Sequence, residues 1–185
     1  MRTGDVMTIA GLVLAAGAGT RFGQPKAPVV LDGERLVDRA VRGLAEGGCD
    51  PVYVGLGAWV GEVDGADILV NDDWPEGMGS SLRLGLQALS EQTSADAVIV
   101  TLVDLPGLTS EAIRRLADTD ADLAAACYSG ERGHPVKLAR RHWAEAIAVA
   151  QGDEGARRLL RGRDDVVLVE VGDVAAGYDV DVPVE

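Results

Sequence analysis

The sequence predicts a three-layer α/β protein in which a mainly parallel, twisted sheet carries helices on both faces. Three observations support this prediction. Short apolar segments alternate with segments of helical periodicity along the chain. The length of 185 residues suits one domain with a single, well-covered core. No repeat of about 20–50 residues and no low-complexity tract interrupts the alternation.

The first predicted strand runs from Thr8 to Leu14, where the chain is apolar and bounded by glycines. A loop rich in glycine follows, and glycines let the backbone turn sharply and approach a ligand closely. Exposed N–H groups in such a turn bind anions. Arg21 and Lys26 add two positive charges to this loop. We therefore expect the phosphates of a nucleoside triphosphate to lie over it.

Two familiar glycine loops do not match this segment. A P-loop requires a lysine directly after its last glycine, and none follows Gly23. The dinucleotide motif G-x-G-x-x-G requires its third glycine one place earlier than the sequence has it. A tight structural turn would be the simpler interpretation of the glycines alone. The two cations favour a binding loop.

The next elements follow from local patterns. Apolar residues at helical spacing predict a helix over 36–44, which Gly47 and Gly48 end. Residues 51–56 and 67–70 are short apolar strands, and the glycines of 57–65 predict a loop between them.

A polar glycine loop, residues 71–79, leads into a helix that we expect to begin near Ser80. Ser80 or Ser81 is the expected N-cap, and the helix start offers free N–H groups to an anion or a base carbonyl. Capping alone would also explain the serines, and Trp74 is more simply explained as a core residue.

The apolar strand 97–103 ends in Asp104, at the carboxyl end of a predicted central strand, where ligands bind in open α/β sheets. A carboxylate there suits Mg²⁺ shared with phosphates. Asp104 could instead cap a turn, although Thr109 is well placed to cap the helix 110–116.

The last third of the chain predicts further alternating elements. Asp179 and Asp181 follow them, and the alternation of an extended chain puts both on one face. The expected elements are a strand over 122–128, a turn and a returning strand over 129–138, a helix over 143–148 with Trp143 in the core, a helix over 151–160 and a strand over 166–171.

Bulk properties narrow the function. A net charge of −13 argues against extended contact with nucleic acid or an anionic membrane. No apolar run is long enough to span a membrane and no secretory leader is evident, so we expect a cytoplasmic protein. Cys49 and Cys127 are expected to be buried free thiols. Residues 1–7 look like a loose extension before a single domain, 8–185.

Six motifs together resemble the nucleotidyltransferases related to the molybdenum-cofactor enzymes (MobA/MocA-like), and most of all the molybdopterin cytidylyltransferases. The resemblance implies a Rossmann-like fold of the nucleotide-diphospho-sugar transferase type. The motifs are L-A-A-G-A-G-T-R-F-G-Q-P-K (14–26), N-D-D-W-P-E-G-M-G-S-S-L-R (71–83), D-L-P (104–106), G-H-P-V (133–136), G-D-E-G-A-R-R-L-L (152–160) and D-V-D-V-P (179–183).

The resemblance also implies roles for residues. Arg21, Lys26 and Asp104 would be catalytic, with Mg²⁺, or Mn²⁺ in its place, held by Asp104 and by Asp179 or Asp181. His134 would contact the acceptor, while Arg83 and Arg157 have no settled role. The nucleotide contacts implied are Leu14, Ala15, Ala16, Gly17, Gly19, Gly79 and Ser80.

The implied reaction is transfer of a nucleotide to the phosphate of molybdopterin with release of pyrophosphate. Ala16 in L-A-A-G favours CTP, because the resemblance associates L-A-G-G with GTP. One methyl group discriminates by only about 1–3 kcal/mol. A molybdoenzyme could receive the product. Two alternatives remain open: a transferase acting on a sugar phosphate or another small phosphate, and a non-catalytic carrier of nucleotide or cofactor.

Overall fold

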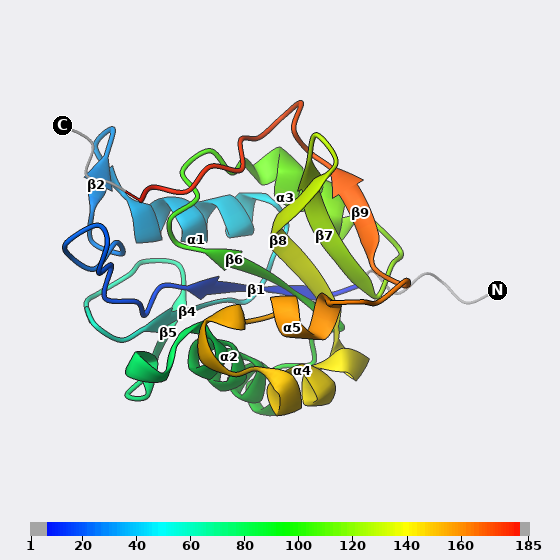
Figure 1. Cartoon of the computed structure of the whole chain (residues 1–185), viewed down its shortest axis with the longest axis horizontal. Coiled ribbons are helices and arrows are strands. Elements are labelled where there is room, and N and C mark those ends of the chain that lie inside the picture. Colours follow the sequence, from blue (N-terminus) through cyan, green and yellow to red (C-terminus); the bar gives the residue numbers. More distant parts are fainter. Residues whose placement is uncertain (1–6, 182–185) are drawn as a thin grey trace.

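The fold is a twisted seven-stranded sheet between two layers of helices, seen in a computed structural model that describes residues 7–181. The predicted extension 1–7, apart from Met7, and the last two residues of the D-V-D-V-P motif lie outside the described residues. Figure 1 shows helices on both faces of the sheet. The predicted three-layer α/β class is confirmed.

The sheet has the strand order β5-β4-β1-β6-β8-β7-β9 and is mainly parallel, as predicted. Only β8 runs antiparallel to its neighbours, β6 and β7. Its return is the one expected after the turn near residue 130. The strands are β1 (Ile9–Leu14), β4 (Val52–Leu56), β5 (Asp67–Val70), β6 (Ala97–Leu102), β7 (Leu123–Tyr128), β8 (Glu131–Ala139) and β9 (Val167–Glu170).

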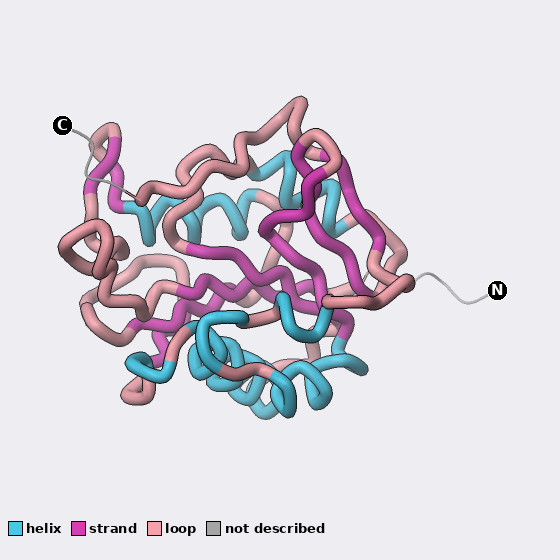
Figure 2. The backbone as a smooth tube through the Cα atoms, viewed as in Figure 1, coloured by secondary structure: helices cyan, strands magenta, loops and turns pink. Residues whose placement is uncertain are grey.

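Each face of the sheet is covered by its own helices and forms its own core (Figures 1 and 2). α1 (Leu36–Glu46) and α3 (Ser110–Ala117) pack on one face. α2 (Met78–Gln92), α4 (Trp143–Val149) and the short α5 (Arg157–Leu160) pack on the other. The central strands are therefore buried on both sides, which explains their continuous apolar sequences.

The helix starts test the predicted caps. Thr109 caps α3, because its hydroxyl accepts a hydrogen bond from the Ala112 N–H at 3.2 Å. The predicted cap of α2 by Ser80 or Ser81 is wrong. That helix begins two residues earlier, at Met78, after Gly77 with φ of 117° and without a side-chain cap. Glycine reaches this conformation without strain, so the helix can start before the serines.

Two local predictions need correction. Residues 151–160 form a 3₁₀ turn, Gly152–Glu154, and the four-residue α5 instead of one helix. Gly152 and Gly155 adopt positive φ of 54° and 49°, which a right-handed helix does not allow. A small hairpin of β2 (Val30–Leu31) and β3 (Glu34–Arg35) also precedes α1, where no strand was expected.

Buried side chains agree with the predicted core. Trp143 is 1% exposed, and its indole N–H donates to the Leu138 carbonyl. Cys49 and Cys127 are buried free thiols.

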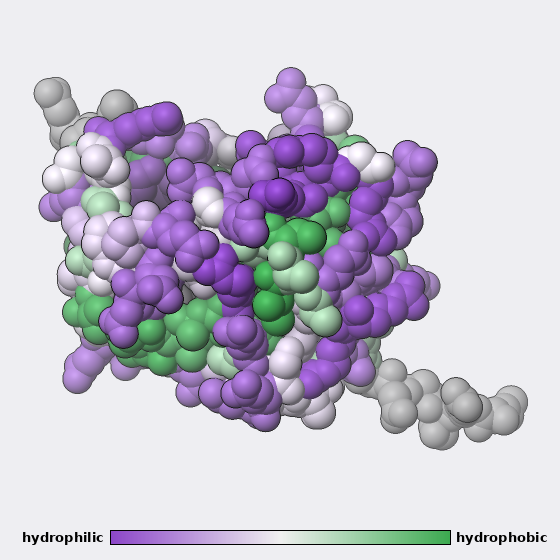
Figure 3. Space-filling view, turned by 60° about the horizontal axis from the view of Figure 1, so that its bottom comes forward, coloured by the Kyte–Doolittle hydropathy of each residue, from purple (hydrophilic) through white to green (hydrophobic). Residues whose placement is uncertain are grey.

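Hydrophilic residues predominate on the face drawn in Figure 3, interrupted by hydrophobic areas. Within residues 7–181, no helix combines the length and the apolar character needed to cross a bilayer.

The segment after β9 returns across the α3 face to the ends of the central strands (Figure 1). Three of the hydrogen bonds that fasten it are made with residues 104–109. The Thr109 hydroxyl donates to the Val174 carbonyl at 3.0 Å, and the N–H groups of Ala176 and Val180 donate to the carbonyls of Gly107 and Asp104, both at 3.0 Å. The segment thus brings Asp179 and Asp181 to the end of β6.

Candidate active site

A cavity of about 420 Å³ opens at the carboxyl ends of β1 and β6. The chain winds to β4 on one side of β1 and to β6 on the other, so the cavity lies where the winding reverses, the usual ligand position in open α/β sheets. Its walls are Leu14, Ala15, Ala16, Gly17, Ala18, Gly19, Thr20, Lys26, Trp74, Pro75, Gly77, Met78, Ser81, Leu102, Val103, Asp104 and Asp153.

The glycine loop forms one wall and contains all five of its predicted nucleotide contacts. Gly19 makes the turn possible. Its φ is 61°, and a Cβ there would lie only 1.9 Å from the Gln24 carbonyl oxygen. The Gly23 N–H closes the turn by donating to the Gly19 carbonyl at 2.7 Å. The loop is therefore compact enough to bring Lys26 back to the cavity.

Lys26 connects the loop to the acidic side of the cavity. Its Nζ lies 2.8 Å from Asp104 Oδ2 and 3.1 Å from Asp181 Oδ1. Burial lowers the pKa of Lys26, but hydrogen bonds and charges from the two carboxylates outweigh it and raise the pKa overall. The hydrogen bond and charge of Lys26 in turn lower the pKa of Asp181. The ammonium group is therefore firmly charged.

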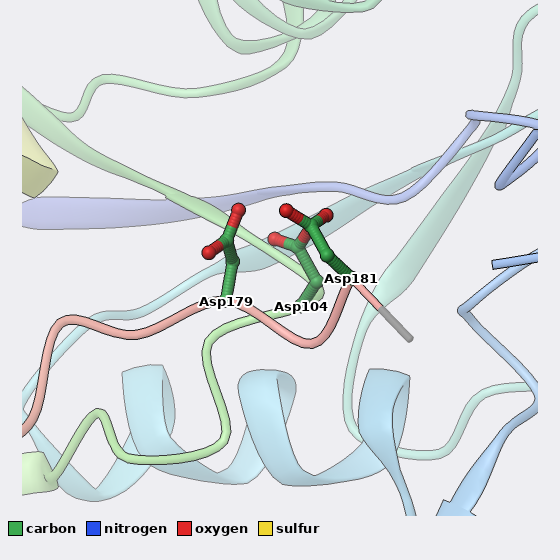
Figure 4. Close-up of side chains that lie close together, drawn as sticks. All are labelled: Asp104, Asp179 and Asp181. Carbon is green, nitrogen blue, oxygen red and sulfur yellow. The ribbon is translucent and has the colours of Figure 1, made fainter. Parts of the chain in front are cut away.

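Asp104, Asp179 and Asp181 form a cluster that suits a divalent cation. Each offers an oxygen, and these oxygens lie within 4.8 Å of one another. Figure 4 shows the three carboxylates converging from the end of β6 and from the C-terminal segment. Asp104 Oδ1 is buried without a hydrogen-bond partner, so it can accept a ligand. Mg²⁺ and Mn²⁺ both bind such oxygens.

Arg21, the other predicted cation, is exposed and does not line the cavity. Within the described residues it makes no ion pair. Its charge nevertheless contributes to lowering the pKa of Asp181, so it acts on the same acidic cluster. An exposed guanidinium near this cluster can pair with the oxygens of a phosphate.

On the opposite wall, the start of α2 differs in detail from the prediction. Gly77, Met78 and Ser81 line the cavity, whereas Gly79 and Ser80 do not. The Ser80 hydroxyl instead holds the loop together through the Gly77 carbonyl at 2.8 Å and the Asn71 amide at 2.9 Å.

His134 lies on β8, outside the cavity lining. Burial and the nearby Arg157 charge lower the pKa of His134 to about 4, against a smaller opposing effect of Asp104. The imidazole is therefore neutral at pH 7 and can donate or accept a hydrogen bond, but it supplies no positive charge.

Arg83 and Arg157, from two of the motifs that resemble the family, differ from each other in burial and in partners. Arg157 is exposed. Arg83 pairs with Glu76 and donates to the Ala150 carbonyl at 2.7 Å, so it ties α2 to the segment before η3 (Gly152–Glu154). Glu154 pairs with Arg161 rather than with Arg157 or Arg158.

The lining residues that the predicted site did not include are Ala18, Thr20, Trp74, Pro75, Gly77, Met78, Ser81, Leu102, Val103 and Asp153. Trp74 is half-buried, so it is a cavity wall as well as a packed side chain. Its place in a polar loop that also contains Gly77 and Gly79 was the available signal. Asp153 lies in the G-D-E-G-A-R-R-L-L motif of the resemblance, but its place in the cavity wall depends on a tertiary contact that the sequence does not reveal.

The match to known families covers most of the chain. The profile of the MobA-like NTP transferase domain matches residues 11–167. The chain belongs to this family. This match agrees with the predicted resemblance to MobA/MocA-like nucleotidyltransferases.

Two relatives with different names are similar to this chain over most of its length. Nicotine blue oxidoreductase of Paenarthrobacter nicotinovorans is 34% identical, covering 96% of this chain and 94% of the relative. A probable molybdenum cofactor guanylyltransferase of Mycobacterium ulcerans is 29% identical, covering 91% and 87%.

Solved structures agree with the fold. The Mycobacterium sp. JC1 homologue of Rv0371c matches with a TM-score of 0.80 and 31% identity over 94% of this chain and 90% of that one. Rv0371c of Mycobacterium tuberculosis, in complex with manganese, matches with a TM-score of 0.75 and 26% identity over 94% of each chain.

Proposed function

We propose that this protein transfers a nucleotide from a nucleoside triphosphate to the phosphate of molybdopterin, with the help of Mg²⁺ or Mn²⁺. The observation that carries the proposal is the position of Lys26, which joins the glycine loop to Asp104 and Asp181 beside one cavity. The family match supports the nucleotidyl transfer. A guanylyltransferase relative supports molybdopterin as the acceptor.

In this reaction an acceptor phosphate oxygen attacks the α-phosphorus, and the bond from that phosphorus to the pyrophosphate oxygen breaks. The acceptor oxygen is already ionised, so no strong base is needed. Lys26 and Arg21 neutralise the departing pyrophosphate, while the loop N–H groups orient the triphosphate. A divalent cation held by Asp104 with Asp179 and Asp181 would supply further neutralisation of the phosphates.

We further propose CTP as the preferred nucleotide, because Ala16 carries a methyl group on the cavity wall. This methyl group has little freedom, since the Ala16 carbonyl accepts from the Ala58 N–H at 3.0 Å. A Cβ on Gly57 would lie 2.9 Å from the Ala16 Cβ, so the wall is closely packed. A smaller pyrimidine base tolerates that wall better than a purine does.

Pyrophosphate release tests both parts of the proposal. The protein is incubated with Mg²⁺ or Mn²⁺ and each of CTP, GTP, ATP and UTP, in the presence of molybdopterin, of a sugar phosphate or of no acceptor. We expect release with CTP and less with GTP, and expect Ala16→Gly to shift the ratio toward GTP by about 10-fold. Release that needs no molybdopterin-type acceptor, or occurs only with a sugar phosphate, would contradict the acceptor. A fixed CTP:GTP ratio in Ala16→Gly would contradict the role of the methyl group.

A second candidate is an oxidoreductase, favoured by the 34% identity to nicotine blue oxidoreductase. Incubation with nicotine blue and NADH or NADPH separates the two candidates. Oxidation of the nicotinamide without pyrophosphate release from any triphosphate would favour the oxidoreductase, and the reverse result would favour the transferase.

A further inference from the structure

Asp153 is a carboxylate in the cavity wall that nucleotidyl transfer leaves unexplained. It is not part of the cation-binding cluster. Within residues 7–181, its carboxylate makes no hydrogen bond and no ion pair. Its neighbours in the wall include Trp74, Pro75 and Met78. The negative charge of Asp153 repels the phosphates of a ligand. The carboxylate and its apolar neighbours must therefore face an uncharged part of the ligand.

Close backbone contacts fix the place of Asp153. A Cβ on Gly77 would lie 2.6 Å from Asp153 Oδ1 and from the Gly152 carbonyl, and one on Gly79 would lie 2.7 Å from the Gln151 nitrogen. Side chains at these two glycines would push η3 away from α2. The carboxylate is therefore held at the wall by the packing of its own backbone.

The chemistry of this wall selects a class of ligand. An ionised carboxylate only accepts hydrogen bonds, and its two oxygens match two parallel donors. The half-buried Trp74 and Met78 offer apolar contacts suited to a flat ring. Together they favour a heteroaromatic ring that presents an N–H and an NH₂ group side by side.

We propose that Asp153 binds the N–H/NH₂ edge of a 2-amino-4-oxopyrimidine ring. Pterin and guanine share this edge, so the ring could belong to the acceptor or to the nucleotide. The pterin source rests on the proposed function, whereas the ring preference itself does not. Asp153 then selects the ring, while Lys26 and the acidic cluster handle the phosphates.

Binding measurements without turnover test the proposal. Titration calorimetry compares 6-hydroxymethylpterin with 6-hydroxymethyllumazine, in which oxygen replaces the 2-amino group, and GTP with ITP, which lacks that group. The full chain is used as wild type, as Asp153→Asn and as the control Asp72→Asn. Asp72 is an exposed acidic residue outside the cavity lining.

We expect the wild type and Asp72→Asn to prefer the amino compound of one pair by about 10- to 100-fold, and Asp153→Asn to lose that preference. Loss in the pterin pair assigns the ring to the acceptor, and loss in the GTP pair assigns it to the nucleotide. Equal affinities within both pairs, absent binding of both amino compounds, or a preference kept by Asp153→Asn would overturn the proposal. A retained ring preference without pyrophosphate release would refute only the proposed transfer.

Discussion

Two lysines in different regions of the molecule are both shielded from water, yet they have opposite surroundings. The Lys26 side chain lines the cavity, is 13% exposed and contacts two carboxylates. Lys137 is fully buried in β8, on the other side of β6 from the glycine loop. Its Nζ donates to the carbonyls of Ala117 and Thr119, at 3.1 and 2.6 Å, where α3 ends.

The difference shows how a buried cation can serve either chemistry or folding. Burial lowers the pKa of Lys137, against smaller opposing effects of Asp120 and Asp118, whereas the pKa of Lys26 is raised overall. Asp104 and Asp181 can bind a metal ion in place of the Lys26 ammonium group, which is then free to bind a phosphate. By contrast, the carbonyls that accept from Lys137 lie where α3 ends, and the helix dipole favours a cation there. Four substitutions test this distinction.

Asp104→Asn should have the largest effect. It removes one charge from the cluster that surrounds Lys26 and one predicted cation ligand. We expect turnover to fall by about 10²–10³-fold with little change in melting temperature, because the amide has nearly the same shape. Pyrophosphate release and thermal unfolding measure the two quantities. Unchanged turnover would remove Asp104 from the site.

Lys26→Met should come next, with a fall in turnover of about 10²-fold, since the triphosphate loses a charged partner. The same change should tighten Mn²⁺ binding without nucleotide by at least about 10-fold, because no ammonium group competes for Asp104 and Asp181. Electron paramagnetic resonance of free Mn²⁺ gives the affinity. Lys137→Met serves as its matched control and should leave Mn²⁺ affinity unaltered.

Lys137→Met should change stability and not binding. It leaves two carbonyls at the end of α3 unpaired, which should lower the free energy of unfolding by about 1–3 kcal/mol. Relief of the buried charge offsets part of this loss. Urea unfolding at pH 7 measures it. A more stable variant would mean that burying the charge costs more than the two hydrogen bonds contribute.

Features that depend on local sequence could be predicted, whereas features that depend on tertiary contacts could not. The alternation of strands and helices, the Thr109 cap and the buried Trp143 follow from local patterns, and the structure confirms them. The meeting of Lys26 with Asp104 could be anticipated, because both follow central parallel strands. Asp153 and Lys137 could not, since their places depend on contacts between segments far apart in the sequence. A lysine between Val136 and Leu138 was the only hint of the second.

Replacing Glu170, at the end of β9, should have the smallest effect. This residue is an anion with a structural role, as Lys137 is a cation with one. Its carboxylate accepts hydrogen bonds from the N–H groups of Ser129, Gly172 and Gly130 at 3.0, 2.9 and 3.2 Å, and from the Cys127 thiol at 3.2 Å. These bonds lower the pKa of Glu170 to about 2.

A folded-state pKa below the unfolded one stabilises the fold above about pH 4.5, and the contribution disappears as the pH falls toward 2. Glu170→Gln should therefore be less stable than wild type at pH 7, with a difference that shrinks by pH 3. Urea unfolding at pH 7, 4.5 and 3 follows it, with exposed Glu91→Gln as the control. A difference that stays constant with pH would show that the amide loses packing rather than charge. Glu170→Gln and Lys137→Met should both leave pyrophosphate release unchanged, because Glu170 and Lys137 lie outside the cavity lining.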